Sequence, residues 1–387
     1  MLKTLQKIFI FFFFVSFVCG EVYSQNRISS PYSRFGVGEI QSYLNSRFIA
    51  IGGTAIAYKS PYSVNFINPA SYSAFDTLSF VFEGGLFSNF SVLKTSTLSQ
   101  NSNYTSMSHL TFGFPITKKW KAAFGLLPYS SVGYKVSDYK TEDSIGRVKY
   151  VYEGQGGINQ FFLGQAFSIN NNLSLGVNVS YLFGSIEKSR TVYLLDSVYT
   201  YNVKAKNSTG YGVFKFDFGI QYFKNLNNNF VLGTGFVYSL GSTSTTKEDF
   251  LAYTFSQSST GYEYVHDTAS IISINNKNGE VKLPQSFAVG LSLEKKNKWL
   301  FGVDFSKQNW SEYLYNNIKD SLDDSWRLSV GYEIKPDFYS LNYLKRVSYR
   351  AGFHYGQSYL NIRNQNFDEF GISFGLGLPL RKSKSTI

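Results

Sequence analysis

The segment LSLGVNVSYLFG, residues 173–184, alternates between two kinds of side chain at almost every step. Its odd-numbered residues are apolar or aromatic, and the residues between them are mostly small or polar. A period of two predicts a β-strand whose two faces meet different surroundings. The same pattern recurs in residues 214–222 and 370–378, where Phe, Ile, Leu and Tyr alternate with Gly, Ser and polar or charged residues.

The composition indicates where such strands lie. Aromatic residues make up 18% of the chain and charged residues only 16%, whereas soluble domains carry about 25% charged residues. The mean hydropathy is −0.15. The apolar faces are too bulky, and the opposite faces too rich in Gly and Ser, for two packed soluble sheets. A membrane barrel fits better, because only alternate residues meet lipid and a closed sheet satisfies its own backbone.

We therefore predict an all-β fold, a transmembrane antiparallel β-barrel over residues 77–380 with about 14 strands, an even number as in bacterial single-chain barrels. The Ser/Thr/Asn-rich regions 187–208 and 241–280 are predicted as extracellular loops. The predicted strands are 78–92, 104–116, 119–135, 147–168, 172–186, 209–224, 228–240, 251–263, 266–276, 283–294, 298–307, 325–335, 346–361 and 367–380.

The N-terminus is typical of a signal peptide, residues 1–24. Lys3 and Lys7 precede an apolar stretch over residues 8–18, and cleavage is expected after Ser24. The alternative is a retained anchor, but eleven residues are short of the roughly 20 that a spanning helix needs. Val18 before Cys19 argues against lipidation. Export to a bacterial outer membrane is the expected localisation.

Residues 25–76 precede the first strand and do not alternate. Apolar residues such as Phe48, Ile51 and Phe66 argue against disorder, so a hatch that plugs the lumen is predicted, with a disordered periplasmic arm as the alternative. At the other end, residues 381–387 are either a basic tail or the start of a closing strand. The sequence leaves open whether the barrel closes on itself.

Several short motifs resemble the FadL/TodX family of outer-membrane transporters for hydrophobic compounds. The hatch has Gly52-Gly53-Thr54-Ala55-Ile56-Ala57 and then Asn68-Pro69-Ala70; the late strands have Leu283-Pro284-Gln285-Ser286-Phe287, Trp310-Ser311 and Arg350-Ala351-Gly352. These come in the family's order over residues 45–380. The opening Ser30-Pro31-Tyr32-Ser33-Arg34-Phe35-Gly36 resembles a Bacteroidota-type subgroup. The resemblance implies a fourteen-stranded barrel plugged by an N-terminal hatch.

Alternation places a set of polar groups on the lumen face: Glu83, Lys215, Asp217, Asp304, Arg350 and His354. Arg350 or Lys215 could hold an acidic head group. Equally, these charges could pair with one another or with the hatch. Pro128 interrupts a predicted strand, and a proline there removes a ladder hydrogen bond. The resemblance implies a lateral opening at that strand, so Pro128 is a candidate for its kink, the alternative being a place at the membrane rim.

No enzyme is predicted. Three His, no Cys after residue 19, and no nucleophile or phosphate-binding motif leave nothing for catalysis, a metal or a cofactor. The net charge of +11 is spread out, so no nucleic-acid surface is expected.

Passive uptake of hydrophobic molecules is the first functional hypothesis, with long-chain fatty acids as the substrate that the resemblance implies. The alternative is a non-transporting barrel in an outer-membrane protein secretion or assembly complex. The expected partners are membrane lipids and lipopolysaccharide, a hydrophobic ligand, and an outer-membrane protein.

Overall fold

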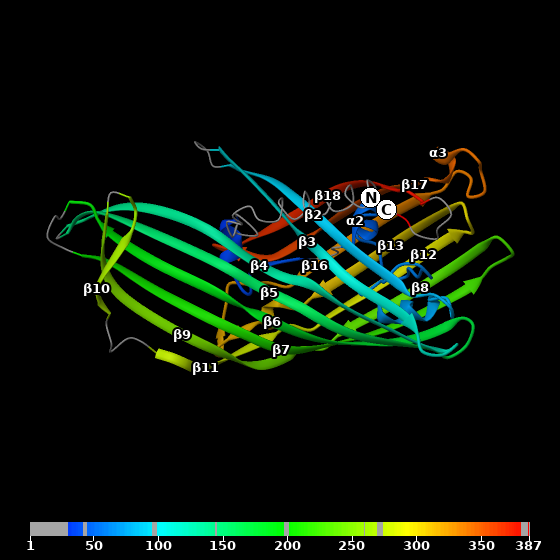
Figure 1. Cartoon of the computed structure of the whole chain (residues 1–387), viewed down its shortest axis with the longest axis horizontal. Helices are drawn as coiled ribbons and strands as arrows, with labels where there is room; N and C mark the ends of the chain where they lie inside the picture. The colour runs from blue at the N-terminus through cyan, green and yellow to red at the C-terminus, as the bar shows by residue number, and fades with distance from the viewer. Residues whose placement is uncertain are drawn as a thin grey trace, which may run out of the picture.

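The computed structural model describes residues 30–41, 45–94, 99–143, 145–196, 201–258, 260–268, 274–380 and 386. They form an antiparallel sheet of eighteen strands that curves around the N-terminal segment, as Figure 1 shows. Among the described residues, no helix is long and apolar enough to cross a membrane. The predicted signal peptide and most of the predicted tail lie outside the described residues.

The N-terminal segment, residues 30–41 and 45–76, is called the hatch below. It contains η1 (Pro31–Arg34), β1 (Glu39–Ile40), α2 (Ser46–Ala50) and η2 (Pro69–Ala74). The remaining elements are β2 (Val81–Lys94), β3 (Ser99–Pro115), β4 (Trp120–Glu142), β5 (Gly146–Ser168), β6 (Leu173–Leu194), β7 (Asn202–Asn225), β8 (Phe230–Ser239), β9 (Ser242–Gln257), β10 (Glu263–Thr268), β11 (Ile274–Leu283), β12 (Ser286–Lys295), β13 (Trp299–Gln308), η3 (Trp310–Glu312), β14 (Leu314–Tyr315), β15 (Ile318–Lys319), β16 (Ser325–Ile334), α3 (Tyr343–Arg346), β17 (Ser348–Ile362) and β18 (Gln365–Gly377).

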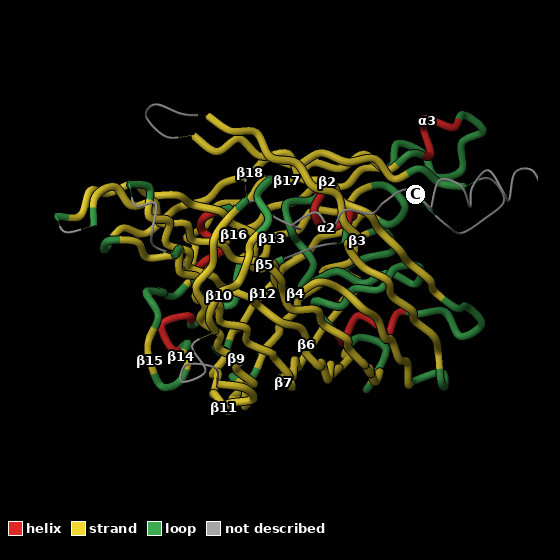
Figure 2. Tube along the Cα trace, turned by 60° about the vertical axis from the view of Figure 1, so that its left-hand side comes forward, coloured by secondary structure: helices red, strands yellow, loops and turns green. Residues whose placement is uncertain are grey.

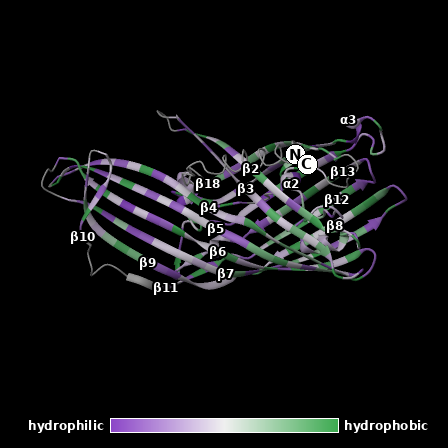
Figure 3. Ribbon diagram, viewed as in Figure 1, coloured by the Kyte–Doolittle hydropathy of each residue, from purple (hydrophilic) through white to green (hydrophobic). Residues whose placement is uncertain are grey.

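The strands turn their apolar faces outward and their polar faces inward. In β6, Leu175 and Tyr181 are about two-fifths exposed, whereas Asn178 and Ser180 are buried. Figure 3 shows hydrophobic and hydrophilic residues alternating along the strands. A soluble sandwich has the opposite arrangement, so this is the pattern of a membrane barrel. The predicted all-β barrel with an N-terminal hatch is confirmed.

Four strands share two positions of the wall. β8 and β9 both pair with β7, one along Asp217–Asn225 and the other along Asn202–Gly210. β12 and β11 pair in turn with β8 and β9, so the four form one long hairpin with β10 at its tip. β14 and β15 make a small hairpin between β13 and β16. Over the described residues the wall therefore has twelve positions, because four of the fourteen predicted segments fill only two.

Two regions predicted as loops are largely strand. β6 continues to Leu194, β7 begins at Asn202, and β9 covers Ser242–Gln257. The first half of β9, Ser242–Asp249, is polar on both faces, so alternation does not mark it, whereas its second half overlaps the strand predicted at 251–263. These regions are strands nonetheless, because each is hydrogen-bonded to its neighbour along its length.

The hydrogen-bonded wall has two ends, β2 and β18. Pairings run from β2 through β7, through the long hairpin, and on through β13, β16 and β17 to β18. Among the described residues, no register joins β18 to β2. The gap between these two strands is called the seam. Figure 2 shows β17, β18 and β2 along one side of the barrel.

Candidate functional site: the hatch and its contacts with the wall

The hatch is a folded plug held together by asparagine side chains. Asn68 caps η2 by accepting a hydrogen bond from the amide of Ala70 at 3.1 Å, and Pro69 occupies the first turn. The Asn68 amide also donates to the carbonyl of Ile56 at 2.7 Å. Asn65 donates to the carbonyls of Ala55 and Tyr58 at 2.7 and 3.0 Å. The Asn-Pro-Ala motif therefore ties η2 to the loop of residues 55–58.

Glycines let the hatch lie directly on the wall. Gly52 and Gly53 have φ of +71° and +95°, a left-handed conformation that favours glycine. A Cβ on Gly52 would lie 2.7 Å from the carbonyl oxygens of Phe353 and Val330, and the Gly52 amide donates to Ser373 Oγ at 3.0 Å. The Gly52-Gly53 motif is thus where the hatch backbone meets β16, β17 and β18.

Three wall strands hold the loop of residues 55–58. The Asp304 carboxylate on β13 accepts hydrogen bonds from the amides of Ala55 and Ile56 at 2.6 and 2.8 Å. Gln221 on β7 donates to the carbonyls of Ile56 and Tyr58. Ser292 on β12 donates to the carbonyl of Ala57 at 2.7 Å. Asp304 is therefore a hatch anchor in this arrangement.

A buried charge cluster joins α2 to the wall. Glu333 on β16 receives hydrogen bonds from Arg47 of the hatch and from Arg350 on β17, both at 2.8 Å. The Arg47 guanidinium also lies over the ring of Tyr58, 4.4 Å from its centroid. Burial in the hatch raises the pKa of the Tyr58 phenol to about 12. Arg350, a predicted lumen cation, is thus paired with the carboxylate of Glu333.

The other predicted lumen groups also have partners or close neighbours. Lys215 and Asp217 form an ion pair with each other on β7. Glu83 on β2 accepts a hydrogen bond from the amide of Val64 in the hatch at 2.7 Å. His354 lies on β17, where a Cβ on Gly371 would be 2.3 Å from its ring. The geometry is that of the second interpretation, in which the charges pair with one another or with the hatch.

Sequence reasoning missed several of the contacting residues. Glu333, Gln221 and Asn178 all face inward by the same alternation and were available to it. Asn178 receives a hydrogen bond from the hydroxyl of Tyr72 at 3.0 Å and donates to the carbonyl of Phe66 at 2.9 Å. Arg47 and Asn65 carry no period that distinguishes them from other hatch residues.

Pro128 lies where β4 leaves β3. The β3–β4 pairing ends at Leu110 and Leu126, two residues before the proline. Toward β5 the ladder continues past Pro128 with only a bulge at Tyr129. Pro128 therefore lies just beyond the end of the β3–β4 pairing and at a bulge in the β4–β5 pairing. The missing N–H is tolerated because a proline can lie at an edge or bulge.

The hatch covers the free edge of β4 beyond this point. Glu39 and Ile40 of β1 pair with Ser131 and Ser130. Ser130 Oγ donates to the carbonyl of Val37 at 2.7 Å, and the Gln41 amide donates to the carbonyl of Tyr129 at 2.9 Å. β1 therefore covers the edge of β4 that β3 leaves free.

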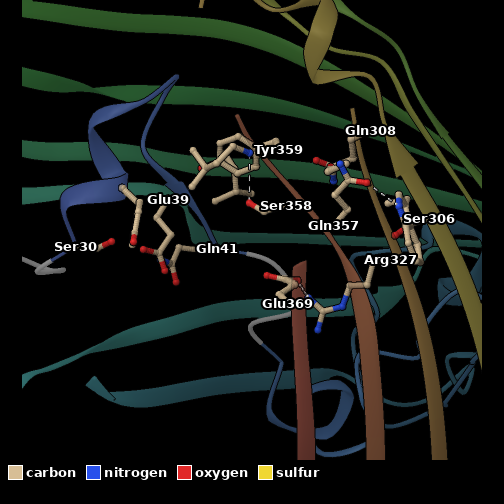
Figure 4. Close-up of a pocket in the computed structure, with 15 residues that line it drawn as sticks. Ser30, Glu39, Gln41, Ser306, Gln308, Arg327, Gln357, Ser358, Tyr359 and Glu369 are labelled. Carbon is tan, nitrogen blue, oxygen red and sulfur yellow. Dashed lines mark hydrogen bonds and ion pairs between the residues drawn. The ribbon is translucent and has the colours of Figure 1, made fainter. Parts of the chain in front are cut away.

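A polar cavity of about 370 Å³ lies between the start of the hatch and β13, β16, β17 and β18. Figure 4 shows Glu39 and Gln41 of the hatch on one side, with Gln308, Arg327, Gln357 and Glu369 of the wall on the other. Arg327 and Glu369 form an ion pair at 3.3 Å. A smaller space of about 10 Å³ lies beside Asp304. Among the described residues, no cluster of three or more His, Cys, Asp or Glu is arranged for a metal.

Comparisons with known proteins give a family and a fold. The family model named BamG matches residues 1–387. No curated protein matches the chain. Similar structures include the toluene transporter TodX of Pseudomonas putida, with 17% identity, 89% of this chain and 91% of that chain covered, and a TM-score of 0.55.

Two further structures are similar. A Pseudomonas aeruginosa FadL homologue has 13% identity, 90% and 88% coverage and a TM-score of 0.58. The CymD monoaromatic hydrocarbon channel has 14% identity, 90% and 91% coverage and a TM-score of 0.54. At these identities the likeness shows a shared fold.

Proposed function

Because the chain belongs to the BamG family and its hatch is bonded to strands on several sides of the lumen, we propose that it is a plugged, non-transporting barrel of the bacterial outer membrane, a structural or docking subunit of a protein secretion or assembly complex. Membership of the BamG family is consistent with such a role. The observation that carries the proposal is the set of hatch contacts described above.

The hatch is bonded to the wall around its circumference. Asp304, Glu333 and Glu83 come from three separate strands, and each carboxylate binds a hatch residue. A hydrogen bond to a charged group contributes about 1.5–3 kcal/mol. Opening a path would break several such bonds in a buried place. These bonds are therefore more consistent with a static plug than with a mobile lid.

The cavity between the hatch and the wall is also of the wrong kind for a hydrophobic solute. Ligand sites for apolar molecules are lined mainly by hydrophobic and aromatic side chains. Here Glu39, Arg327 and Glu369 border the space together with Gln and Ser side chains, and these polar residues outnumber the apolar and aromatic ones by ten to five. An alkyl chain in it would leave these groups without water.

The uneven height of the wall supports a docking role. β5, β6 and β7 have 23, 22 and 24 residues, whereas β12, β13 and β16 have 10 each. A strand needs about 9–11 residues to cross a bilayer. Figure 1 shows the long strands, with β9 and β10, extending together beyond the short ones at one end. We assign this polar extension to the extracellular side, where it offers an upright surface to a partner protein.

Uptake of hydrophobic molecules, of the fatty-acid type or smaller, is the second candidate. It is favoured by the shared fold with TodX, a toluene transporter, and by the separation of β3 from β4 beside Pro128. Lateral release through that gap would require β1 to leave the edge of β4. In either role the outward faces meet membrane lipid and lipopolysaccharide.

A deletion strain separates the two functions. We expect unchanged uptake of labelled oleate and toluene, together with lower amounts of correctly folded outer-membrane proteins, measured by heat-modifiable migration. Complementation with the wild-type gene is the control. Reduced uptake with normal outer-membrane protein levels would support the transporter and defeat the subunit.

A further inference from the structure

One long connection lies at the end of the barrel where β2 begins. Residues 335–347 join β16 to β17, contain α3, and are called the rim loop below. Four other connections at this end, residues 116–119, 169–172, 226–229 and 296–298, have four residues or fewer. Figure 1 shows α3 at the end opposite β10 and the polar extension. A connection as long as the rim loop is uncommon between two neighbouring antiparallel strands.

The rim loop uses its polar side chains to hold its own backbone. Asp337 Oδ1 accepts a hydrogen bond from the amide of Tyr339 at 3.1 Å, and Asn342 caps α3 by accepting one from the amide of Leu344 at 3.0 Å. The Asp337 amide donates to the carbonyl of Lys345 at 2.8 Å, which closes the loop at its neck. Short polar side chains commonly fix turns in this way. The backbone is thus held without burial of the apolar side chains.

Those apolar side chains are turned to the surroundings. Leu341 is fully exposed, Tyr339 is 78% exposed and Leu344 is 65% exposed. Phe338 and Tyr343 of the same loop are also exposed. A group of large apolar residues gathered on one exposed segment marks an interaction site.

A hydrogen bond to the wall places the rim loop on the lipid side. Tyr349 is on the outward face of β17, in alternation with the inward Arg350. Its hydroxyl donates to the carbonyl of Leu344 at 3.1 Å. Because this bond reaches α3 from the outer face of the barrel, the loop extends over lipid and away from the lumen.

An aromatic belt on the wall gives the depth of the rim loop. Phe230 and Trp299 begin β8 and β13, and Tyr332 lies near the end of β16. Their ring centroids are 5.9 Å apart for Phe230 and Trp299, and 6.3 Å apart for Trp299 and Tyr332. Such belts mark the membrane–water interface. The rim loop begins directly after β16, so it starts at the level of this interface.

Basic residues accompany the apolar ones. Lys345 and Arg346 end the rim loop, and the Arg346 guanidinium lies 5.5 Å from the ring centroid of Tyr343. The lysine-rich turn 296–298 is adjacent, because the amide of Lys335 donates to the carbonyl of Lys298 at 2.7 Å. Basic residues beside Tyr and Leu at a membrane surface attract anionic lipid headgroups.

We propose that the rim loop is an interfacial anchor, whose Tyr and Leu side chains enter the membrane surface while its basic residues bind the phosphate of anionic phospholipids. Lipid is favoured over a protein partner because the loop is bonded to the outward face at the level of the aromatic belt, where the surrounding medium is lipid. With the polar extension outside the cell, this leaflet is the periplasmic one. The inference goes beyond the proposed function, because the anchor serves a transporter and a docking subunit equally.

Fluorescence quenching tests the insertion of the loop. The full chain with Cys19→Ser and Leu344→Cys is labelled with nitrobenzoxadiazole, in nanodiscs of phosphatidylcholine and phosphatidylglycerol that contain a lipid with a nitroxide high on its acyl chain. Tyr262→Cys, beside β10, is the matched control, because Tyr262 and Leu344 are each 65% exposed. We expect quenching at Leu344 several-fold stronger than at Tyr262.

Lipid retention tests the charge of the headgroup. Native mass spectrometry compares phosphatidylglycerol with phosphatidylcholine on protein released from the mixed nanodiscs. The variant Lys345→Gln/Arg346→Gln should retain several-fold less phosphatidylglycerol than the wild type. The control Lys140→Gln/Lys149→Gln removes two cations that also lie near tyrosine rings, on the polar extension, and should behave as the wild type.

Two results overturn the proposal. The first is equal quenching at Leu344 and Tyr262, which is the outcome expected if the loop stays in water for a periplasmic protein to bind. The second is phosphatidylglycerol retention that is unchanged in Lys345→Gln/Arg346→Gln, or lowered equally in the control. Only variants with wild-type heat-modifiable migration are compared, and Leu341→Cys replaces Leu344→Cys if that variant does not fold. Neither measurement depends on the deletion phenotype, so this proposal and the proposed function fail separately.

Discussion

Gly52 of the hatch and Gly352 of β17 meet backbone to backbone: a Cβ on Gly352 would lie 2.0 Å from the amide nitrogen of Gly52. Three hundred residues separate them in the chain. No side chain fits between the hatch and the wall at this point, so the two backbones are in direct contact.

Replacing Gly352 with alanine should therefore displace the hatch while leaving the wall intact. Overpacking of this kind costs about 1–3 kcal/mol. We expect a lower midpoint of thermal unfolding in detergent and faster proteolysis of the hatch. Gly302→Ala is the control, because a Cβ there would meet Thr54 at an ordinary 3.5 Å. Equal behaviour of the two variants would contradict the docked arrangement.

Removing the charge of Asp304 should loosen the loop of residues 55–58. In Asp304→Asn the side-chain amide oxygen can still accept from Ala55 and Ile56, but both hydrogen bonds lose their charge assistance, which makes them about half as strong. Conductance of the protein in planar bilayers should show openings that the wild type lacks. Asp267 is exposed on β10, so Asp267→Asn is the control and should show no channel openings. If neither variant shows channel openings, the hatch stays closed without this anchor.

The cluster around Glu333 should be the most sensitive to a single change. Glu333→Gln leaves Arg47 and Arg350 without their common carboxylate. Breaking a buried ion pair in this way costs about 3–5 kcal/mol. We expect the largest fall in thermal stability of any hatch-facing variant. Adding Arg47→Met should recover part of the loss, because one uncompensated cation is removed. A double variant less stable than Glu333→Gln would reject this account.

Docking of β1 should weaken as the pH rises. Burial, and then the nearby charge of Glu369, raise the pKa of Glu39. A carboxyl whose folded pKa is raised favours the folded form at low pH and loses that contribution as pH rises from the unfolded value through the folded one. Protease cleavage of the first hatch residues should be slower at pH 4 than at pH 7. Glu39→Gln should remove most of that difference, and a difference of unchanged size would argue against Glu39 as its source.

A disulfide between Ile40→Cys and Ser130→Cys would fix β1 to the edge of β4, where the two residues are register partners. For a plugged subunit, oxidation should change neither solute uptake nor outer-membrane protein levels. A loss of oleate or toluene uptake that dithiothreitol reverses would show instead that solutes leave through the β3–β4 gap.

Sequence reasoning succeeded where the physics is local. Residues such as Phe216 and Phe218 alternate with Asp217 because lipid lies on one side and the lumen on the other. The Asn68 cap depends on neighbours only two residues away. Both kinds of signal are contained in a short stretch of chain, which is why the barrel fold could be predicted and why the Asn68 cap is within reach of the same reasoning.

The features that escaped prediction depend on distant pairing. The residues around Ser239 and Ser242 give no sign that β8 and β9 lie end to end and both pair with β7. The seam, and the separation of β3 from β4 after Leu110 and Leu126, depend on hydrogen bonding between strands, which the sequence of a single segment does not contain. Some lumen charges were found by alternation, but their hatch partners, such as the amide of Val64 for Glu83, lie on a segment without a period.

The seam also bears on how the molecule is made. A cylinder sealed before its plug arrives would have to be threaded through one mouth, and a cylinder built around its plug would need the plug ordered first. Without a register between β2 and β18 in the described part of the chain, the N-terminal residues can pack against the inner face of the sheet before its two edge strands are brought together. Order of assembly then becomes a matter of which contacts form fastest, and no topological trap stands between the unfolded chain and the finished plug.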